Sequence, residues 1–191
     1  MPIWAEEPDT WARIEEQQIP TYEAVLGAAG LGDSVLDVGC GTGVFLRLCA
    51  DRGAAVAGLD ATDALLARAR TRVPEADLRL GDMQSLPFPD RAFDLVTGFT
   101  SFFYADDVVA ALREAARVSR RSVAITTFGD PARCDVLPAG SDWRPEILDA
   151  LLPQAGLVGA RSLTIEWAYA DGRSNEWRIV VASSAASSPA R

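Results

Sequence analysis

The sequence has 191 residues, and its 27 acidic side chains outnumber its 18 basic ones to give a formal net charge of −9. This balance argues against proteins that hold nucleic acids or anionic membranes, because such binding depends on basic side chains that neutralise phosphate. The chain contains no histidine, which excludes histidine-based triads, metal sites and general bases. We therefore expect a small-molecule partner, no nucleic acid, no membrane and no metal, and a monomer or homodimer.

The chain shows no targeting signal. Residues 1–7 lack the basic start and apolar run of a secretory signal, and no stretch approaches the roughly 20 apolar residues of a membrane span. The three cysteines are widely spaced and match neither a disulfide framework nor a metal-ligand pattern. These features predict a cytoplasmic protein with a single domain over residues 1–183 and a disordered tail over residues 184–191.

The first part of the chain is predicted to be helical. Asp9 is a plausible cap for a first helix, Pro20 is expected to divide the segment, and Thr21 is expected to cap a second helix that ends near Ala29. We expect residues 1–30 to form a helical cap over the active site.

The rest of the chain alternates between short apolar runs and segments with helical spacing. This alternation predicts a parallel sheet covered by helices on both faces, and two adjacent strands at the end predict an antiparallel hairpin. Asp94 is expected to fix the start of its strand. The predicted strands are 34–38, 54–59, 77–80, 93–99, 122–127, 159–169 and 175–183, the helices are 44–52, 62–72, 106–119 and 145–155, and the hairpin turn is 170–174.

The strongest signal is the glycine-rich turn between the first strand and the following helix, over residues 35–43. Such a turn lets a ligand approach the backbone closely, at the sheet edge where open parallel sheets bind ligands. A dinucleotide-binding fold is the rival interpretation, and Gly39 and Gly41 match its first two glycines. Its third glycine would fall at Val44, and Gly43 lies one residue too early. An NAD-dependent oxidoreductase is therefore disfavoured.

Residues 35–43 resemble the signature of class I S-adenosylmethionine (SAM)-dependent methyltransferases. Further matches follow in order: Asp60 ends the second strand, Asp82 follows the third, and residues 86–96 are similar to the segment before the fourth strand in small-molecule methyltransferases. The resemblance covers residues 20–183. It implies an α/β, three-layer Rossmann-like fold with a seven-stranded, mostly parallel sheet and an antiparallel terminal hairpin strand.

The resemblance also implies SAM as cofactor and S-adenosylhomocysteine (SAH) as product. Asp60 would accept hydrogen bonds from the ribose hydroxyls, Asp82 would take the adenine amino group, and Phe99 would line the sulfonium side, although each residue has a simpler reading in capping or packing. The implied cofactor residues are Asp37, Gly39, Cys40, Gly41, Thr42, Gly43, Asp60, Ala61, Leu65, Asp82, Met83, Gln84 and Phe99.

Methyl transfer from a sulfonium is an in-line displacement that depends mainly on positioning. A general base is needed only if the acceptor loses a proton early, and Tyr22, Tyr104 and Asp106 are weak candidates whose alternative roles are packing and capping. The expected function is methyl transfer to an O, N or C atom of a small molecule, in a setting such as bacterial secondary metabolism. The alternative is a protein that binds SAM without methylating.

An acceptor would lie over the carboxyl edge of the sheet under a roof of aromatic side chains. Residues 128–134 resemble a segment that some bacterial methyltransferases place after the fifth strand, although the lid that follows is short here. A dimer partner could complete the roof, or the site is open. Cys134 reads as a packed thiol. The candidate roof residues are Trp4, Trp11, Tyr22, Phe102, Phe103 and Trp143.

Overall fold

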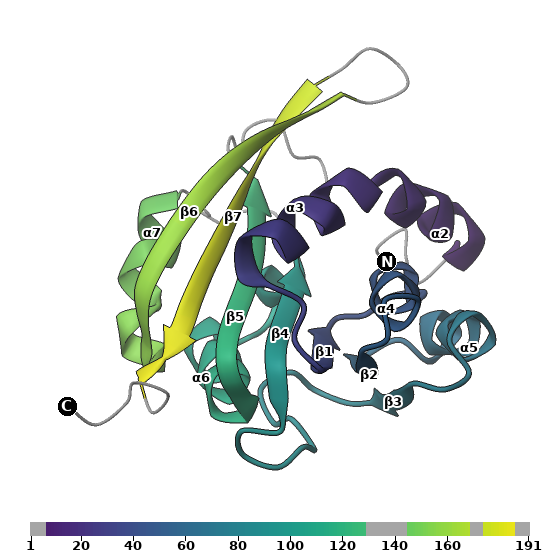
Figure 1. The fold of residues 1–191 in the computed structure, drawn as a ribbon, viewed down its shortest axis with the longest axis horizontal. Helices are drawn as coiled ribbons and strands as arrows, with labels where there is room; N and C mark the ends of the chain where they lie inside the picture. The colour runs from purple at the N-terminus through teal and green to yellow at the C-terminus, as the bar shows by residue number, and fades with distance from the viewer. Residues whose placement is uncertain (1–6, 129–144, 169–173, 186–191) are drawn as a thin grey trace.

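The computed structural model describes residues 7–128, 145–168 and 174–185. Within them, seven strands form one sheet in the order β3-β2-β1-β4-β5-β7-β6 (Figure 1). The predicted α/β fold with a mostly parallel sheet and an antiparallel terminal hairpin strand is confirmed. The strands are β1 (Ser34–Val38), β2 (Ala55–Asp60), β3 (Asp77–Leu80), β4 (Phe93–Phe99), β5 (Ser119–Phe128), β6 (Leu157–Ala168) and β7 (Ser174–Ser184).

The strand order reverses around β1, which pairs in parallel with β2 on one side and with β4 on the other. The connections that leave β1 and β4 therefore diverge to opposite faces of the sheet. In open α/β sheets, this divergence opens a crevice outside the carboxyl ends of the two strands. The topology thus places the glycine-rich turn and the residues after β4 around one crevice.

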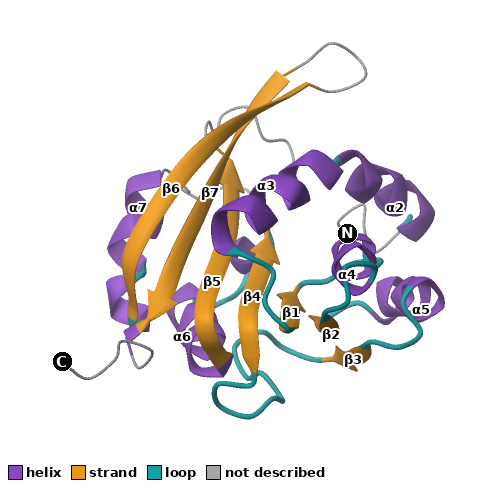
Figure 2. Cartoon of the chain, viewed as in Figure 1, coloured by secondary structure: helices purple, strands orange, loops and turns teal. Residues whose placement is uncertain are grey.

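Helices cover both faces of the sheet, as the strand pattern predicts (Figure 2). Val35 of β1 packs with α3 and α4, whereas its neighbour Leu36 packs with α6 and α7, because successive side chains of a strand point to opposite faces. Both side chains are fully buried, and each contributes roughly 1.5–3 kcal/mol on burial. The α-helices are α2 (Pro8–Gln17), α3 (Ile19–Ala29), α4 (Val44–Ala50), α5 (Asp63–Arg72), α6 (Val108–Val118) and α7 (Pro145–Leu151).

Two aspartates anchor the starts of α6 and β4, and the second of them, Asp94, was predicted to do so. The Asp107 Oδ1 accepts a hydrogen bond from the Ala110 N–H at 2.9 Å and caps α6, an interaction worth about 1 kcal/mol. Asp94 fixes the start of β4, because its Oδ2 accepts from the Asp33 N–H at 3.0 Å and its Oδ1 pairs with Arg120 at 3.0 Å.

The predicted boundaries of the N-terminal helices are wrong in detail. The break falls at Gln18, and Pro20 lies within the first turn of α3, where its missing N–H has no helical partner to lose. Thr21 is fully buried inside α3 and does not cap it. Asp9 lies in the first turn of α2, whose N-cap position is Glu7. None of the helices within the described ranges is long and apolar enough to cross a bilayer.

The C-terminal part differs from the prediction at its boundaries. Residues 145–155 do not form one helix: α7 ends at Leu151 and a separate 3-10 turn (Pro153–Ala155) follows, because proline interrupts the hydrogen bonding of a helix. Strand β7 continues through Ser184, one residue beyond its predicted end. The antiparallel pairing of β6 with β7 is confirmed, while residues 170–173 of the predicted turn lie outside the described residues.

Candidate functional site

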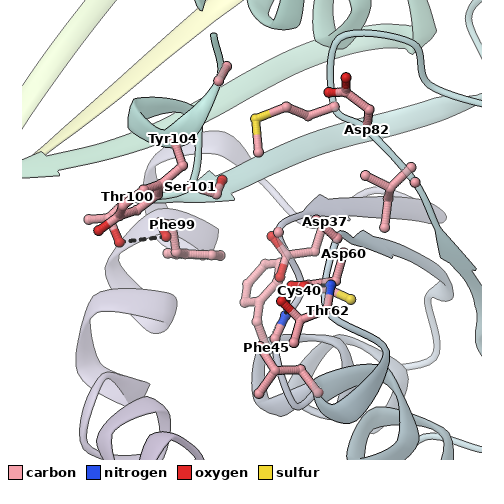
Figure 3. A pocket seen from close by; sticks show the side chains of 18 of the residues that line it. Asp37, Cys40, Phe45, Asp60, Thr62, Asp82, Phe99, Thr100, Ser101 and Tyr104 are labelled. Atoms are coloured by element: carbon pink, nitrogen blue, oxygen red, sulfur yellow. Dashed lines mark hydrogen bonds between the residues drawn. The ribbon is translucent and has the colours of Figure 1, made fainter. Parts of the chain in front are cut away.

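A cavity of about 510 Å³ lies at the carboxyl ends of β1, β2 and β4 (Figure 3). Small-molecule sites typically have volumes of roughly 300–1,000 Å³. The predicted catalytic candidates Tyr22, Tyr104 and Asp106 line it, whereas Thr42 and Gly43 do not. The predicted cofactor residues that line it are Asp37, Gly39, Cys40, Gly41, Asp60, Ala61, Leu65, Asp82, Met83, Gln84 and Phe99.

The glycine-rich turn is held by hydrogen bonds from its own N–H groups. The N–H groups of Gly39 and Cys40 both donate to the carbonyl of Leu59, at 2.7 and 3.0 Å. The next two N–H groups donate to carboxylates instead of to backbone: the Gly41 N–H meets the Asp60 Oδ2 at 2.9 Å, and that of Thr42 meets Glu15 at 3.1–3.2 Å. Two side-chain carboxylates therefore occupy donors that a phosphate would need in a dinucleotide site.

Asp60 forms hydrogen bonds with the loops that follow β1 and β2. While its Oδ2 holds Gly41, its Oδ1 accepts from the Thr62 N–H at 2.8 Å, just ahead of α5. The side chain is buried, and burial raises its pKa although the hydrogen bonds from Gly41 and Thr62 lower it. Each carboxylate oxygen keeps a second lone pair, so Asp60 retains acceptor capacity toward the cavity.

Glu15 of α2 is the main residue that the sequence interpretation missed. It is only 6% exposed and lines the cavity. Besides accepting from the backbone of Thr42, it accepts from the Thr42 Oγ1 at 2.5 Å. Its signal was helical spacing: with Trp11, Gln18 and Tyr22 it recurs at intervals of three or four residues, and all four line the cavity.

The positions of Thr42 and Gly43 explain why they do not reach the cavity. Thr42 is fully buried, and its Oγ1 also accepts from the Arg72 guanidinium at 2.5 Å. Gly43 has a φ of 80° and packs against α5, since an added Cβ would lie 3.2 Å from the Ala69 Cβ. Gly41 makes room for a protein group as well: a Cβ there would lie 1.8 Å from the Glu15 Oε1.

Asp37 is the most buried of the carboxylates that line the cavity. It is 3% exposed, and its Oδ1 accepts from the Thr97 Oγ1 at 2.7 Å. Burial raises the pKa of Asp37 well above its usual range; the nearby charges of Glu15 and Asp60 raise it further, while the Thr97 hydrogen bond lowers it. Glu15, Asp37 and Asp60 thus concentrate negative charge in a poorly solvated place.

Three aromatic rings pack together at the cavity wall. Tyr22 meets Phe99 edge-on at 4.5 Å between centroids and Phe45 at 5.4 Å, and Phe45 lies 4.7 Å from Phe99. Such pairs add about 0.5–1.5 kcal/mol each beyond their buried area. Burial raises the pKa of Tyr22 well above 10, and Glu15 and Asp37 raise it further, so its phenolate is unfavourable at neutral pH.

Only part of the predicted aromatic roof lines the cavity. Trp11 and Tyr22 do so, but Phe102 and Phe103 are buried and are not among the lining residues. Phe102 packs into the apolar core with α6 and lies against Gly98, where an added Cβ would be 2.3 Å from its ring. Trp4, Trp143, Cys134 and the rest of the segment after Phe128 lie outside the described residues.

The loop after β3 forms one rim of the cavity. Asp82 is exposed there, and its Oδ1 accepts from the Gln84 N–H at 2.9 Å. The Gln84 Oε1 in turn accepts from the Asp107 N–H at 2.7 Å, which ties this loop to the start of α6. Leu65 of α5 is buried, and its side chain and that of Met83 both add apolar surface to the cavity.

The segment after β4 forms another part of the rim, where Thr100 and Tyr104 face Asp37 and Asp60 across the cavity (Figure 3), while the Ser101 Oγ donates to the Val38 carbonyl at 2.5 Å. Thr100 has a φ of 55°, a conformation that is costly for a β-branched residue and is typical of functional sites. Its N–H donates to the Thr126 Oγ1 at 3.1 Å. Tyr104 is 37% exposed at the mouth.

The charged side chains that line the cavity are all of one sign. Of the lining residues within the described part of the chain, five are carboxylates and none is an arginine. Fields of one sign in a cleft with low-dielectric walls concentrate ligands of opposite charge. The cavity therefore suits a ligand with positive charge better than one with phosphates.

Comparison with known proteins identifies the family. A family model described as a methyltransferase domain matches residues 36–125. A malonyl-[acyl-carrier protein] O-methyltransferase of Serratia marcescens is 34% identical over 119 residues, which cover 62% of this chain and 46% of that protein. A phosphatidylethanolamine N-methyltransferase of Cereibacter sphaeroides is 32% identical over 136 residues, which cover 68% of this chain and 66% of that protein.

The chain spans less than half the length of several curated relatives that it matches. Among solved structures, a SAM-dependent methyltransferase from Aquifex aeolicus superimposes with a TM-score of 0.71 at 20% identity, covering 92% of this chain and 97% of that one. This likeness shows the fold, and the sequence matches show the descent. The chain belongs to the family of class I SAM-dependent methyltransferases.

Proposed function

We propose that this protein transfers the methyl group of SAM to a small-molecule acceptor. The observation that carries the proposal is the glycine-rich turn, two of whose N–H groups are held by the carboxylates of Asp60 and Glu15. SAM bears an ammonium and a sulfonium, which these buried carboxylates and Asp37 would stabilise. A dinucleotide would instead bring its pyrophosphate against them, at a considerable electrostatic cost.

The residues present fit the parts of this cofactor. Asp60 retains lone pairs for the ribose hydroxyls, Asp82 has an exposed carboxylate for the adenine amino group, and Leu65 supplies an apolar surface for the ring. When bound, SAM supplies an electrophilic methyl group on a positively charged sulfur. The lining residues would hold the acceptor in line with the sulfonium, and such positioning can contribute roughly 7–11 kcal/mol in favourable cases.

The acceptor would lie between the segment after β4 and the N-terminal helices. Trp11 and Tyr104 offer aromatic surfaces there, and Asp106 offers an exposed carboxylate. The raised pKa of Tyr22 keeps its hydroxyl protonated at neutral pH, so it cannot accept a proton, which favours Asp106 or the acceptor itself for proton removal. An oxygen, nitrogen or carbon acceptor is compatible with this arrangement, and a role in bacterial secondary metabolism belongs to the same proposal.

The test is calorimetric titration with SAM and, separately, with SAH. We expect both to bind, and we expect Asp60→Ala to lose both. Asp63→Ala is the matched control, because Asp63 is an exposed acid three residues further along that pairs with Arg70 at the surface. Absence of binding by the wild-type protein to either compound refutes the proposal.

Methyl transfer itself is tested with isotopically labelled SAM and a panel of amines, phenols and carboxylic acids. Appearance of labelled product together with SAH supports methylation. If SAM binds and stays intact with every acceptor while SAH binds only weakly, a SAM-binding protein that does not methylate becomes the better interpretation.

A further inference from the structure

Glu15 is a buried carboxylate that faces the cavity without a cation beside it. Among the described residues, no arginine forms an ion pair with it. Arg72 of α5 lies nearby without contacting Glu15, since its guanidinium donates to the Thr42 Oγ1 at 2.5 Å and pairs with Glu16, not Glu15, at 2.8 Å. Buried charges in proteins are normally paired, so the position requires an explanation.

The charged and titratable groups around Glu15 make its ionised form harder to hold. Asp37 of β1 and Asp60 of β2 are negative neighbours, and burial raises the pKa values of both. Tyr22 of α3 and Cys40 of the turn are buried, with raised pKa values of their own. The Arg72 charge and hydrogen bonds from Thr42 and Trp11 lower the pKa of Glu15, but burial dominates and raises it to about 7.

The carboxylate also has room for a further donor. Its present donors are the N–H and the hydroxyl of Thr42 and the side chain of Trp11, whereas two carboxylate oxygens offer about four lone-pair sites. A sulfonium has no hydrogen to donate, but an ammonium has three. An ammonium group next to Gly41 would therefore suit the acceptor site that remains on Glu15.

We propose that Glu15 binds the α-ammonium group of the cofactor's amino-acid part, and that it gives up a proton when the cofactor binds. The inference rests on the proposed function, because it concerns the same cofactor. Its consequence is that helix α2, which lies outside the sheet and its covering helices, is a determinant of cofactor affinity. Cofactor binding then strengthens the contact between α2 and the glycine-rich turn.

The experiment uses two ligands that differ in the amino-acid part. SAH carries the ammonium, whereas 5′-methylthioadenosine has the same nucleoside and thioether without it. Calorimetry at pH 6 in two buffers of different ionisation enthalpy counts the protons released on binding. For a carboxyl with a pKa of about 7, we expect wild-type protein to release about 0.9 proton with SAH and none with 5′-methylthioadenosine.

In Glu15→Gln, we expect SAH affinity to fall at least tenfold and the proton release to disappear, with 5′-methylthioadenosine affinity changed less than twofold. Glu16→Gln is the matched control, since Glu16 is the adjacent, exposed acid, and should behave as wild type. Asp37→Asn gives the competing assignment: if it abolishes the proton release while Glu15→Gln preserves it, the ammonium belongs to Asp37 and the inference is overturned.

The remaining outcomes separate the two proposals. Unchanged SAH affinity in Glu15→Gln overturns the role of Glu15 and leaves the cofactor site intact, and equal losses for both ligands show a purely structural role. Failure of wild-type protein to bind SAM, SAH and 5′-methylthioadenosine refutes the proposed function itself. The wild-type proton count needs no variant, so the inference is testable even if Glu15→Gln does not fold, and a count near zero overturns it.

Discussion

The burial of the Glu15 carboxylate should make the stability of the ligand-free protein depend on pH. Its pKa of about 7 in the folded state compares with 4.5 for an ordinary glutamate. A raised carboxyl pKa means that the folded state binds the proton more tightly, so the stability is present below pH 4.5 and is lost as the pH rises through 7. The shift corresponds to about 3 kcal/mol, of which about 2.5 kcal/mol falls between pH 5 and pH 8.

Glu15→Gln removes this dependence because glutamine does not titrate. We expect the stability of the variant relative to wild type to increase by about 2.5 kcal/mol between pH 5 and pH 8, which is roughly 5–10 °C in Tm for a chain of this size. The prediction concerns how the difference in the free energy of unfolding between variant and wild type changes with pH. The hydrogen bonds to Thr42 that the variant loses add a constant to this difference and do not change its slope.

The assay is urea unfolding without ligand at pH 5, 6, 7 and 8. Glu16→Gln is the control, because Glu16 has a side-chain exposure of 54% and forms a surface ion pair with Arg72, worth at most about 1 kcal/mol. Its difference from wild type should stay flat. A flat difference for Glu15→Gln would refute the assignment, since it would mean that the folded protein holds an ionised Glu15 at no penalty.

Three further substitutions test the site and its support. Gly41→Ala should reduce SAH affinity more than tenfold by calorimetry, because its Cβ would lie 1.8 Å from the Glu15 Oε1; unchanged affinity contradicts the close packing. Phe102→Ala should reduce the free energy of unfolding by roughly 3–5 kcal/mol, and a loss of SAH binding without destabilisation would instead favour a roof role. Asp94→Ala should cost roughly 1–3 kcal/mol in urea unfolding, because it removes the acceptor of the Asp33 N–H; a change below 0.5 kcal/mol, on the order of an ordinary surface substitution, contradicts that role.

Most of the fold could be read from local patterns in the sequence. The apolar run of β1 followed by glycines predicted a strand, a turn and a helix, and the structure has β1, the turn and α4 at those positions. Asp107 was predictable as a cap because capping is a contact across a few neighbouring residues. Predicted helix boundaries were wrong where two local rules competed. Pro20 was expected to end a helix, but proline is also tolerated in the first turn of one, and there the structure places it.

The site was only partly predictable. Glycine spacing and the acids that end β2 and follow β3 indicated a ligand at the sheet edge, and those residues do line one cavity. Phe102 was misplaced because an aromatic residue just after a strand has the same local pattern whether it faces a ligand or the core. Gly98 decides the matter, since it leaves space for the ring on the core side.

The sequence by itself determined the order of strands and helices, the glycine-rich turn and the excess of negative charge, because these depend on residue type and short spacings. The tertiary structure alone decided which groups satisfy the N–H donors of that turn. Thr42 meets Glu15 across 27 residues of chain, and the meeting depends on where α2 packs against α4 and α5. In the sequence, Glu15 looks like an ordinary surface carboxylate of a helix. It becomes part of the site because the fold buries it beside N–H groups of the glycine-rich turn that have no backbone partner.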